Sequence, residues 1–259
     1  MKTSAAASTT KEYQYMLNEA TIAKLNAMRL YGMAAGFVDR MGTVKSAGLS
    51  HEEFFGLVVD DEKTYRDNAK LTRLLIKARL KQTAALEDID YRHPRGLDKQ
   101  TMSELAGVQW LPRHQNVLIT GPTGVGKSFL ACALGNQACR SGYSTNYFRF
   151  PRLFETLLAA RGEGTYLKLL GRLAKTSLLI FDDFGLSRLS ASEAKDFLEI
   201  LDDRSGSAST IITSQLPLTQ WHEIIEEPTL ADALCDRLFH NAFKLQLKGE
   251  SLRKRPNSK

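Results

Sequence analysis

The chain has 259 residues, 43% of them hydrophobic, and a formal net charge of +6, which is enough for one sizeable α/β domain and a smaller appendage. Its polar start and the lack of an apolar run of about 18 residues argue against a secretion signal and a membrane span, so we expect a cytoplasmic protein without a membrane partner. Three cysteines without a CxxC pair and five scattered histidines argue against a disulfide or a zinc site.

The basic charge is concentrated in the flanks of the chain. Residues 116–243 are slightly acidic, whereas residues 244–259 contain six Lys and Arg and a single Glu. This distribution indicates a polyanionic partner bound by the flanks, and the first candidate is a nucleic acid.

The N-terminal part of the chain predicts a small helical domain. Residues 1–20 are expected to be disordered, because they begin with a run of small polar residues. Apolar residues at near-helical spacing predict a helix from about Thr21, interrupted by Gly32 and Gly36. We expect a DNA-binding or partner-binding domain over residues 21–95.

A second helix is predicted to begin at Ser50, because Ser50 and Glu53 have the spacing of a capping box. Further along, "NAKLTRLLIKARLKQ" (68–82) combines an apolar stripe with a basic row and contains no acidic residue. The basic residues recur every three or four positions: Lys70, Arg73, Lys77 and Lys81. They predict a helix face that contacts DNA phosphates, with an ordinary solvated face as the alternative.

The most specific motif lies in "ITGPTGVGKSFLACAL", where a β-branched stretch precedes a glycine-rich turn and an apolar, alanine-rich run follows it. The turn matches G-x-x-x-x-G-K-[ST], in which backbone N–H groups and the start of a helix bind phosphate. The expected nucleotide-binding residues are consecutive: Gly121, Pro122, Thr123, Gly124, Val125, Gly126, Lys127, Ser128 and Phe129. Lys127 is expected to reach the β- and γ-phosphates of ATP, and Ser128 to bind Mg²⁺. A turn that binds nothing is the alternative.

Strands and helices are predicted beyond this motif as well. Gly142 is expected to end the P-loop helix, residues 145–150 to form a strand, and Pro151 to begin another helix. Further helical stretches are expected up to Lys175 and over residues 192–204.

Two acidic residues follow the apolar run "LLIF", which has the form of a buried parallel strand that opens at a ligand crevice. Asp182 is expected to bind Mg²⁺, and Asp183 to polarise the attacking water as a general base. A later strand, "STIITS", ends just before Gln215. That side chain is expected to lie between the γ-phosphate and the two acids and to sense the nucleotide, with a plain strand end as the alternative.

Together these segments resemble a known family. The stretches "NVLITGPTGVGKSFLACALGNQACRSGY", "LLIFDDFG", "STIITSQLP", "LADALCDRLFHNA" and "LKGESLRKR" occur in this order. They are similar to the IstB-like ATPases, the transposition helper proteins of insertion sequences, over about Lys24 to Arg253. That family is related to the DnaC helicase loaders and to DnaA within the AAA+ class.

The resemblance implies an α/β fold with an AAA+ P-loop core over residues 96–253 and a basic tail at residues 254–259. The parallel strands are expected in the order 5-1-4-3-2, with helices on both faces of the sheet. The sensor strand is expected between the strand of the P-loop and the strand of the two acids.

The resemblance also implies a homo-oligomer with ATP at its subunit interfaces. Arg237 of one subunit would complete the site of the next, because a guanidinium is permanently charged and donates in pairs to phosphate oxygens. Arg204 is a rival for this role, and an ion pair of Arg237 with Asp236 or Asp232 is the alternative. Arg253 matches the C-terminal pattern of the family, but its role does not follow from the sequence.

Two residues fit the pattern of the family only loosely. Its sensor strand often ends in Ser-Asn, whereas Ser214 is followed here by Gln215, and the second acid is Asp183 where many AAA+ motors have glutamate. Each difference changes the reach of a side chain by one methylene. We therefore expect slow ATP hydrolysis that depends on DNA and on assembly.

The expected function is that of an ATP- and Mg²⁺-dependent helper that multimerises on duplex DNA and recruits and stimulates its cognate transposase. A helicase loader of the DnaC type is the main alternative. A P-loop kinase of small molecules and a module that binds ATP only as structural glue are the other two.

Overall fold

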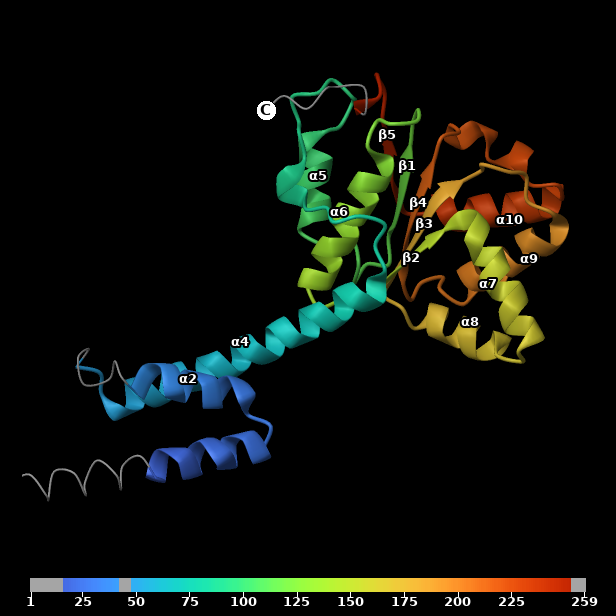
Figure 1. Cartoon of the computed structure of the whole chain (residues 1–259). Helices are drawn as coiled ribbons and strands as arrows, with labels where there is room; N and C mark the ends of the chain where they lie inside the picture. The colour runs from blue at the N-terminus through green and yellow to red at the C-terminus, as the bar shows by residue number, and fades with distance from the viewer. Residues whose placement is uncertain (1–15, 42–47, 253–259) are drawn as a thin grey trace, which may run out of the picture. The chain divides into compact units, whose positions relative to one another are not determined.

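The structure is a computed structural model that describes residues 16–41 and 48–252 (Figure 1). The described part divides into two compact units, one up to Thr72 and one from Arg73. This division falls inside the long helix α4 (His51–Ala78).

The segment that follows α4 belongs to the second unit, although the sequence predicts a domain boundary after residue 95. The segment packs on α6 (Lys127–Arg140), where the side chain of Asn136 donates a hydrogen bond to the carbonyl oxygen of Ala84 at 2.7 Å. Ala84 is buried as a result. The turn residues near position 95 therefore lie within the second unit.

The first unit is helical. Residues 16–27 form a helix, which includes the end of the segment predicted to be disordered, and α2 (Tyr31–Met41) follows after a turn. Because the turn precedes Gly32 and Gly36, the prediction that these glycines interrupt a helix is wrong. Both lie inside α2 where it packs on α4, and a Cβ on Gly32 would lie 2.6 Å from the carbonyl oxygen of Asp61. The glycines allow the two helices to approach closely.

The predicted capping box at the start of α4 is confirmed. The N–H of Ser50 donates to the carboxylate of Glu53 at 2.7 Å, and the N–H of Glu53 donates to the hydroxyl of Ser50 at 3.2 Å. These two bonds satisfy backbone donors that a helix start leaves without a partner.

A sheet of five parallel strands forms the centre of the second unit. The strands are β1 (Asn116–Thr120), β2 (Thr145–Arg149), β3 (Leu178–Phe184), β4 (Ser209–Ser214) and β5 (Ala242–Gln246). Their order is β2-β3-β4-β1-β5, and all neighbouring pairs are parallel. The predicted order is confirmed, and β4 lies between β1 and β3 as expected.

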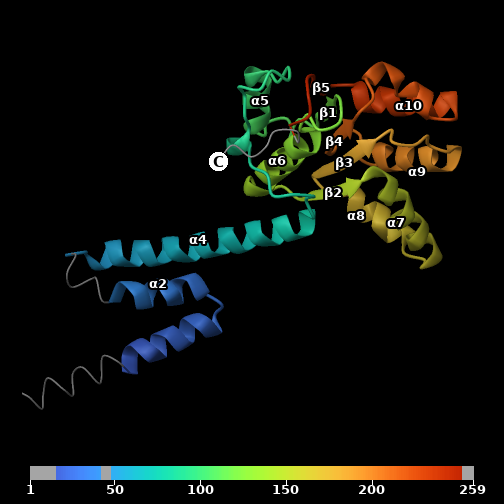
Figure 2. The same cartoon turned by 45° about the horizontal axis from the view of Figure 1, so that its top comes forward.

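Helices cover both faces of this sheet, as predicted (Figures 1 and 2). One face carries α5 (Lys99–Ala106) and α6, and the other carries α7 (Phe150–Gly162), α8 (Tyr166–Ala174), α9 (Ala191–Asp202) and α10 (Pro228–Phe239). Short 3-10 helices occur at Leu86–Asp88, Leu218–Gln220 and His222–Ile224. The parallel sheet with helices on both faces confirms the predicted α/β architecture of this unit.

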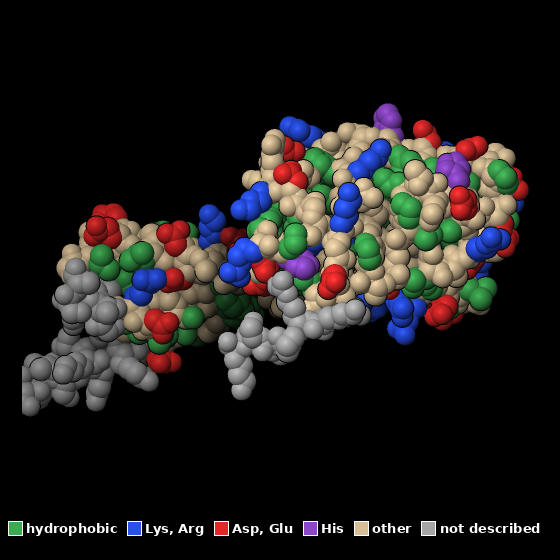
Figure 3. Space-filling view, turned by 90° about the horizontal axis from the view of Figure 1, so that it is seen from above, with side chains coloured by type: hydrophobic (Ala, Val, Ile, Leu, Met, Phe, Trp, Pro, Cys, Tyr) green, Lys and Arg blue, Asp and Glu red, His purple; other side chains and the backbone are tan. Residues whose placement is uncertain are grey.

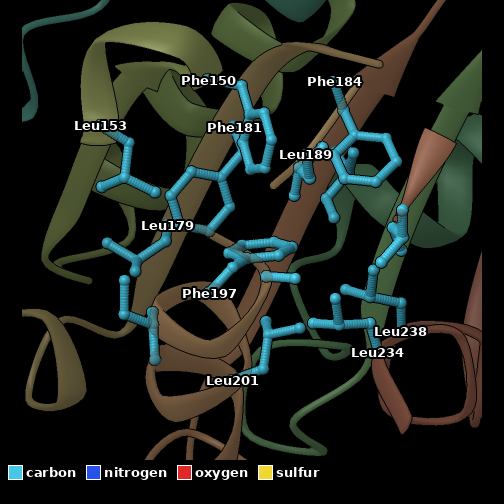
Figure 4. Close-up of a cluster of buried hydrophobic side chains, with 14 of the residues drawn as sticks. Phe150, Leu153, Leu179, Phe181, Phe184, Leu189, Phe197, Leu201, Leu234 and Leu238 are labelled. Atoms are coloured by element: carbon cyan, nitrogen blue, oxygen red, sulfur yellow. The ribbon is translucent and has the colours of Figure 1, made fainter. Parts of the chain in front are cut away.

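Leucine and phenylalanine side chains form much of the core under α7 to α10 (Figure 4). The ring of Phe150 contacts those of Phe181 and Phe184 on β3 and of Phe197 on α9, at centroid distances between 4.9 and 6.0 Å. Edge-to-face contacts of this kind add to the stabilisation from apolar burial. They hold β3, the strand of the two acids, in place against its helices.

The three cysteines are buried and unbonded. Among the residues that the structure describes, no helix is both long enough and apolar enough to span a bilayer.

Candidate active site

The glycine-rich turn joins the end of β1 to the start of α6, as the sequence predicts. Gly121 and Gly126 have φ angles of 144° and 98°, which residues with a Cβ rarely adopt. A Cβ on Gly121 would also lie 2.4 Å from the carbonyl oxygen of Leu247. The path of the turn thus requires glycine.

Lys127 is the first residue of α6, and its side chain folds back over the turn. Its ammonium donates hydrogen bonds to the carbonyl oxygens of Gly121 at 2.7 Å and of Pro122 at 2.8 Å. The positive end of the α6 dipole lies at the same place. A fixed ammonium and a helix start are the groups that phosphate-binding sites in proteins use.

The carboxylate of Asp182 is fully buried at the end of β3. Four side chains donate hydrogen bonds to it: Ser128 at 2.7 Å, Thr213 at 2.5 Å, Tyr147 at 2.5 Å and Lys81 at 2.8 Å. Burial alone would raise the pKa of Asp182, but these hydrogen bonds outweigh burial and leave the pKa below its ordinary value. The carboxylate is therefore ionised at neutral pH.

Asp183 differs from its neighbour in exposure and backbone conformation. Its φ is 68°, which is unusual for a residue other than glycine, and its N–H donates to the hydroxyl of Thr213 at 3.1 Å. Its carboxylate accepts a hydrogen bond from the guanidinium of Arg149 at 3.2 Å and is partly exposed. Such a strained conformation at a crevice suits a residue that faces a ligand.

Gln215 lies just after β4 and is bonded to the P-loop. Its side-chain oxygen accepts a hydrogen bond from the hydroxyl of Thr123 at 2.8 Å. The structure thus places the amide beside the turn that the sequence predicts to bind phosphate.

A cavity of about 610 Å³ opens where these segments meet. Many of the predicted site residues line it: Thr123, Gly124, Gly126, Lys127, Ser128, Phe129, Asp183 and Gln215. Gly121, Pro122 and Val125 complete the turn without lining the cavity, and Val125 is fully buried. Asp182 lies behind Ser128, whose hydroxyl joins it to the cavity.

Several residues of the site are not in the sequence-based prediction: Lys81 in this role, Arg95, Tyr147, Arg149 and Leu252. Arg149 is the register partner of Asp182 on the neighbouring strand. Its position near the end of a predicted strand could have indicated that it belongs to the site. Arg95 is only 3% exposed and donates to the carbonyl oxygen of Val125 at 3.1 Å. No local pattern marks it.

Lys81 does not belong to the predicted basic helix face. The sequence predicts a helix up to Gln82, but α4 ends at Ala78, and Arg79 has a φ of 51°. This left-handed residue turns the chain, and the Lys81 ammonium reaches Asp182 instead. The prediction that Lys81 lies on the DNA-contacting face is therefore wrong for this structure.

Lys70, Arg73 and Lys77 do lie on α4, and all three are exposed. Their spacing of three and four residues puts them on one side of the helix. Elsewhere, on the face of the molecule that Figure 3 shows, Lys and Arg side chains lie scattered among Asp and Glu. The row of Lys70, Arg73 and Lys77 on α4 stays a prediction for phosphate contacts.

Arg237 lies near the end of α10, outside the cavity of its own chain. Its guanidinium is paired with Asp202 of α9, not with Asp236 or Asp232, and also donates to the carbonyl oxygen of Ala233 at 2.9 Å. The carbonyl oxygen of Arg237 bonds to Asn116 at the first residue of β1, opposite the end of β1 that leads into the P-loop. Any contact of Arg237 with a nucleotide must therefore involve another subunit.

Arg204 is only 2% exposed, so it is excluded as the arginine that reaches a neighbouring subunit. Its guanidinium donates to carbonyl oxygens of its own chain. The predicted disorder of residues 1–15 and the roles expected of the C-terminal tail and Arg253 concern residues outside those that the structure describes.

The amino-acid sequence is similar to that of known proteins. The family described as IstB-like ATP binding protein matches residues 23–259. The insertion sequence ATP-binding protein y4pL of Sinorhizobium fredii is 50% identical over 94% of this chain and 100% of its own length. The ATP-binding protein of insertion sequence IS1162 of Pseudomonas fluorescens is 47% identical over 78% of this chain and 88% of its own length.

Solved structures with low sequence identity share the fold. DnaA from Aquifex aeolicus bound to AMPPCP superimposes with a TM-score of 0.56 at 19% identity, over 65% of this chain and 51% of that chain. The DnaC helicase loader superimposes with a TM-score of 0.52 at 23% identity, over 64% of this chain and 97% of that chain.

Proposed function

The chain belongs to the family of IstB-like ATP-binding proteins, and from this premise we propose that it is an ATP-dependent DNA-binding helper of transposition. It multimerises on duplex target DNA and recruits and stimulates the cognate transposase. One observation carries the proposal: Lys127, the partly exposed Asp183, and Ser128 with its hydrogen bond to the buried Asp182 meet at one cavity of nucleotide size.

The residues beside the P-loop fit a Mg²⁺ ion. Ser128 and Asp182 offer a hydroxyl and a carboxylate that lie 2.7 Å apart, and oxygen ligands are those that Mg²⁺ prefers. These two residues would hold the ion, which neutralises phosphate charge when it is bound.

The chain's own groups perform the remaining work. Lys127 and the N–H groups of the turn bind the β- and γ-phosphates. Asp183 accepts a proton from the attacking water, and Arg149 orients its carboxylate from the neighbouring strand. Gln215, bonded to Thr123 of the P-loop, reports on the phosphates to the end of β4.

Assembly completes the site. The guanidinium of Arg237 pairs with Asp202 and lies outside the cavity of its own chain, so we propose that it reaches the nucleotide of the next subunit and stabilises the charge that develops on the γ-phosphate. Hydrolysis is slow, because the aspartate at position 183 is one methylene shorter than glutamate. Lys70, Arg73 and Lys77 contact DNA phosphates without reading sequence.

The first test is sedimentation and electron microscopy of the protein with duplex DNA, with and without a slowly hydrolysed ATP analogue. We expect multimers on the duplex only when the analogue is present. A protein that stays monomeric whether or not DNA and the analogue are present would overturn the proposal and favour a small-molecule kinase.

A second assay separates this function from that of a helicase loader. A transposition helper raises the rate of strand transfer by its cognate transposase, whereas a loader binds a replicative helicase and leaves strand transfer unchanged. Transfer that is unaffected by the protein and ATP would therefore favour the loader.

A further inference from the structure

Lys81 approaches the buried Asp182 from the nucleotide cavity. Its ammonium lies 2.8 Å from Oδ2 of Asp182 and 4.0 Å from Oδ2 of Asp183. Lys81 and Ser128 both line the cavity. Lys81 thus occupies the side of Asp182 from which a metal ion held with Ser128 must approach.

The carboxylate of Asp182 has little room for a further partner. Oδ1 accepts hydrogen bonds from Thr213 and Ser128, and Oδ2 accepts them from Tyr147, Ser128 and Lys81. A carboxylate offers about four lone-pair positions. An ion that binds Asp182 has to displace one of these donors.

Lys81 is the donor that can leave most readily. Its side chain is 41% exposed, so its ammonium can reach water, whereas Thr213 is fully buried. Electrostatics acts in the same direction, because two cations on one carboxylate repel each other. Without Lys81, three neutral hydroxyl donors still hold the carboxylate.

We propose that Lys81 and Mg²⁺ are alternative cationic partners of Asp182, so that Lys81 sets the magnesium concentration at which ATP is bound. This inference rests on the proposed function in one respect, namely that the cavity binds Mg-ATP. Lys81 is a positioning residue: it holds the metal-binding carboxylate ready and yields it to the ion.

The test is a titration with a fluorescent ATP analogue at increasing Mg²⁺ concentration. In Lys81→Met we expect the Mg²⁺ concentration for half-maximal binding to fall on the order of tenfold, because a charge-assisted hydrogen bond no longer competes. Lys195→Met, which removes an exposed lysine of α9, is the matched control and should titrate like the wild type. Damage to the site would raise the required concentration, so a decrease is specific.

A second reading uses EDTA in place of Mg²⁺. There Lys81→Met should bind the analogue more weakly than the wild type, because Asp182 then faces the phosphates without a cation, and Lys81→Arg should restore binding. An unchanged magnesium titration in Lys81→Met would overturn the proposal. Loss of binding at saturating Mg²⁺ would also overturn it and make Lys81 a nucleotide ligand. If the wild type binds no nucleotide at all, the proposed function itself fails.

Discussion

The buried side chain of Arg204 connects backbone segments within the second unit. Its guanidinium donates to the carbonyl oxygens of Leu173, Thr176 and Ser209 at 2.5 to 2.7 Å, between the end of α8 and the start of β4. Burial lowers its pKa to about 9. The side chain of Arg204 thus connects the end of α8 to the start of β4.

Replacing Arg204 should destabilise the fold. Arg204→Met leaves these carbonyls without the guanidinium donor, so we expect a loss of about 3 to 5 kcal/mol in unfolding free energy. Arg172→Met, at an exposed position of α8, should stay within about 0.5 kcal/mol of the wild type. Urea unfolding followed by tryptophan fluorescence measures both, and equal stability of the two variants would contradict this role.

At the same scale, contiguous motifs could be read from the sequence and distant contacts could not. The P-loop and the two acids have fixed spacing, so local chemistry identifies them. Lys81 and Asp182 are separated by 101 residues, and Tyr147 and Asp182 by 35. These contacts exist only because strand order and one left-handed residue bring the side chains together.

The helices of the first unit offer a matched pair of glycines. A Cβ on Gly32 in α2 would collide with backbone atoms of Asp61 and Glu62, whereas a Cβ on Gly56 in α4 would meet nothing within 4 Å. Gly32→Ala should separate the helices at a cost of about 1 to 3 kcal/mol. Gly56→Ala should stabilise α4 by about 0.5 to 1 kcal/mol.

Hydrogen exchange of the amides of α2 reports this difference directly. Exchange should become faster in Gly32→Ala and stay unchanged or become slower in Gly56→Ala. Identical exchange in both variants would mean that the close approach of α2 and α4 does not stabilise the unit. The helix break was misplaced in the sequence-based prediction because glycine can end a helix or allow close packing, and the sequence alone does not distinguish these uses.

The basic row of α4 makes a prediction about salt. Replacing Lys70, Arg73 and Lys77 by glutamine should weaken duplex binding and reduce the slope of log affinity against log salt by about 2 to 3, as expected for three lost phosphate contacts. The matched control removes three exposed charges from the region of α8: Lys168, Arg172 and Lys175. If the salt slope decreases equally in both triple variants, the α4 residues contribute no more to duplex binding than other exposed positive charges do.

For the whole molecule, the position of Arg237 predicts complementation between subunits. Lys127→Ala should lose ATP binding and assembly on DNA, whereas Arg237→Ala should bind ATP without hydrolysing it. A mixture should recover part of the ATPase activity, because an intact Arg237 of one subunit can serve an intact P-loop of another. Turnover by Arg237→Ala alone at the wild-type rate would assign that residue to its ion pair with Asp202.

The order of the sheet has a consequence for protein synthesis. β1 pairs with β4 on one side and with β5 on the other, and the N–H of Leu252 donates to the carbonyl oxygen of Gly124 in the P-loop. The N-terminus of a chain leaves the ribosome first, so the P-loop emerges before β4, β5 and Leu252, which complete its surroundings. The nucleotide site is therefore complete only after the segment up to Leu252 has left the ribosome, and we expect nascent chains that lack this segment not to bind ATP.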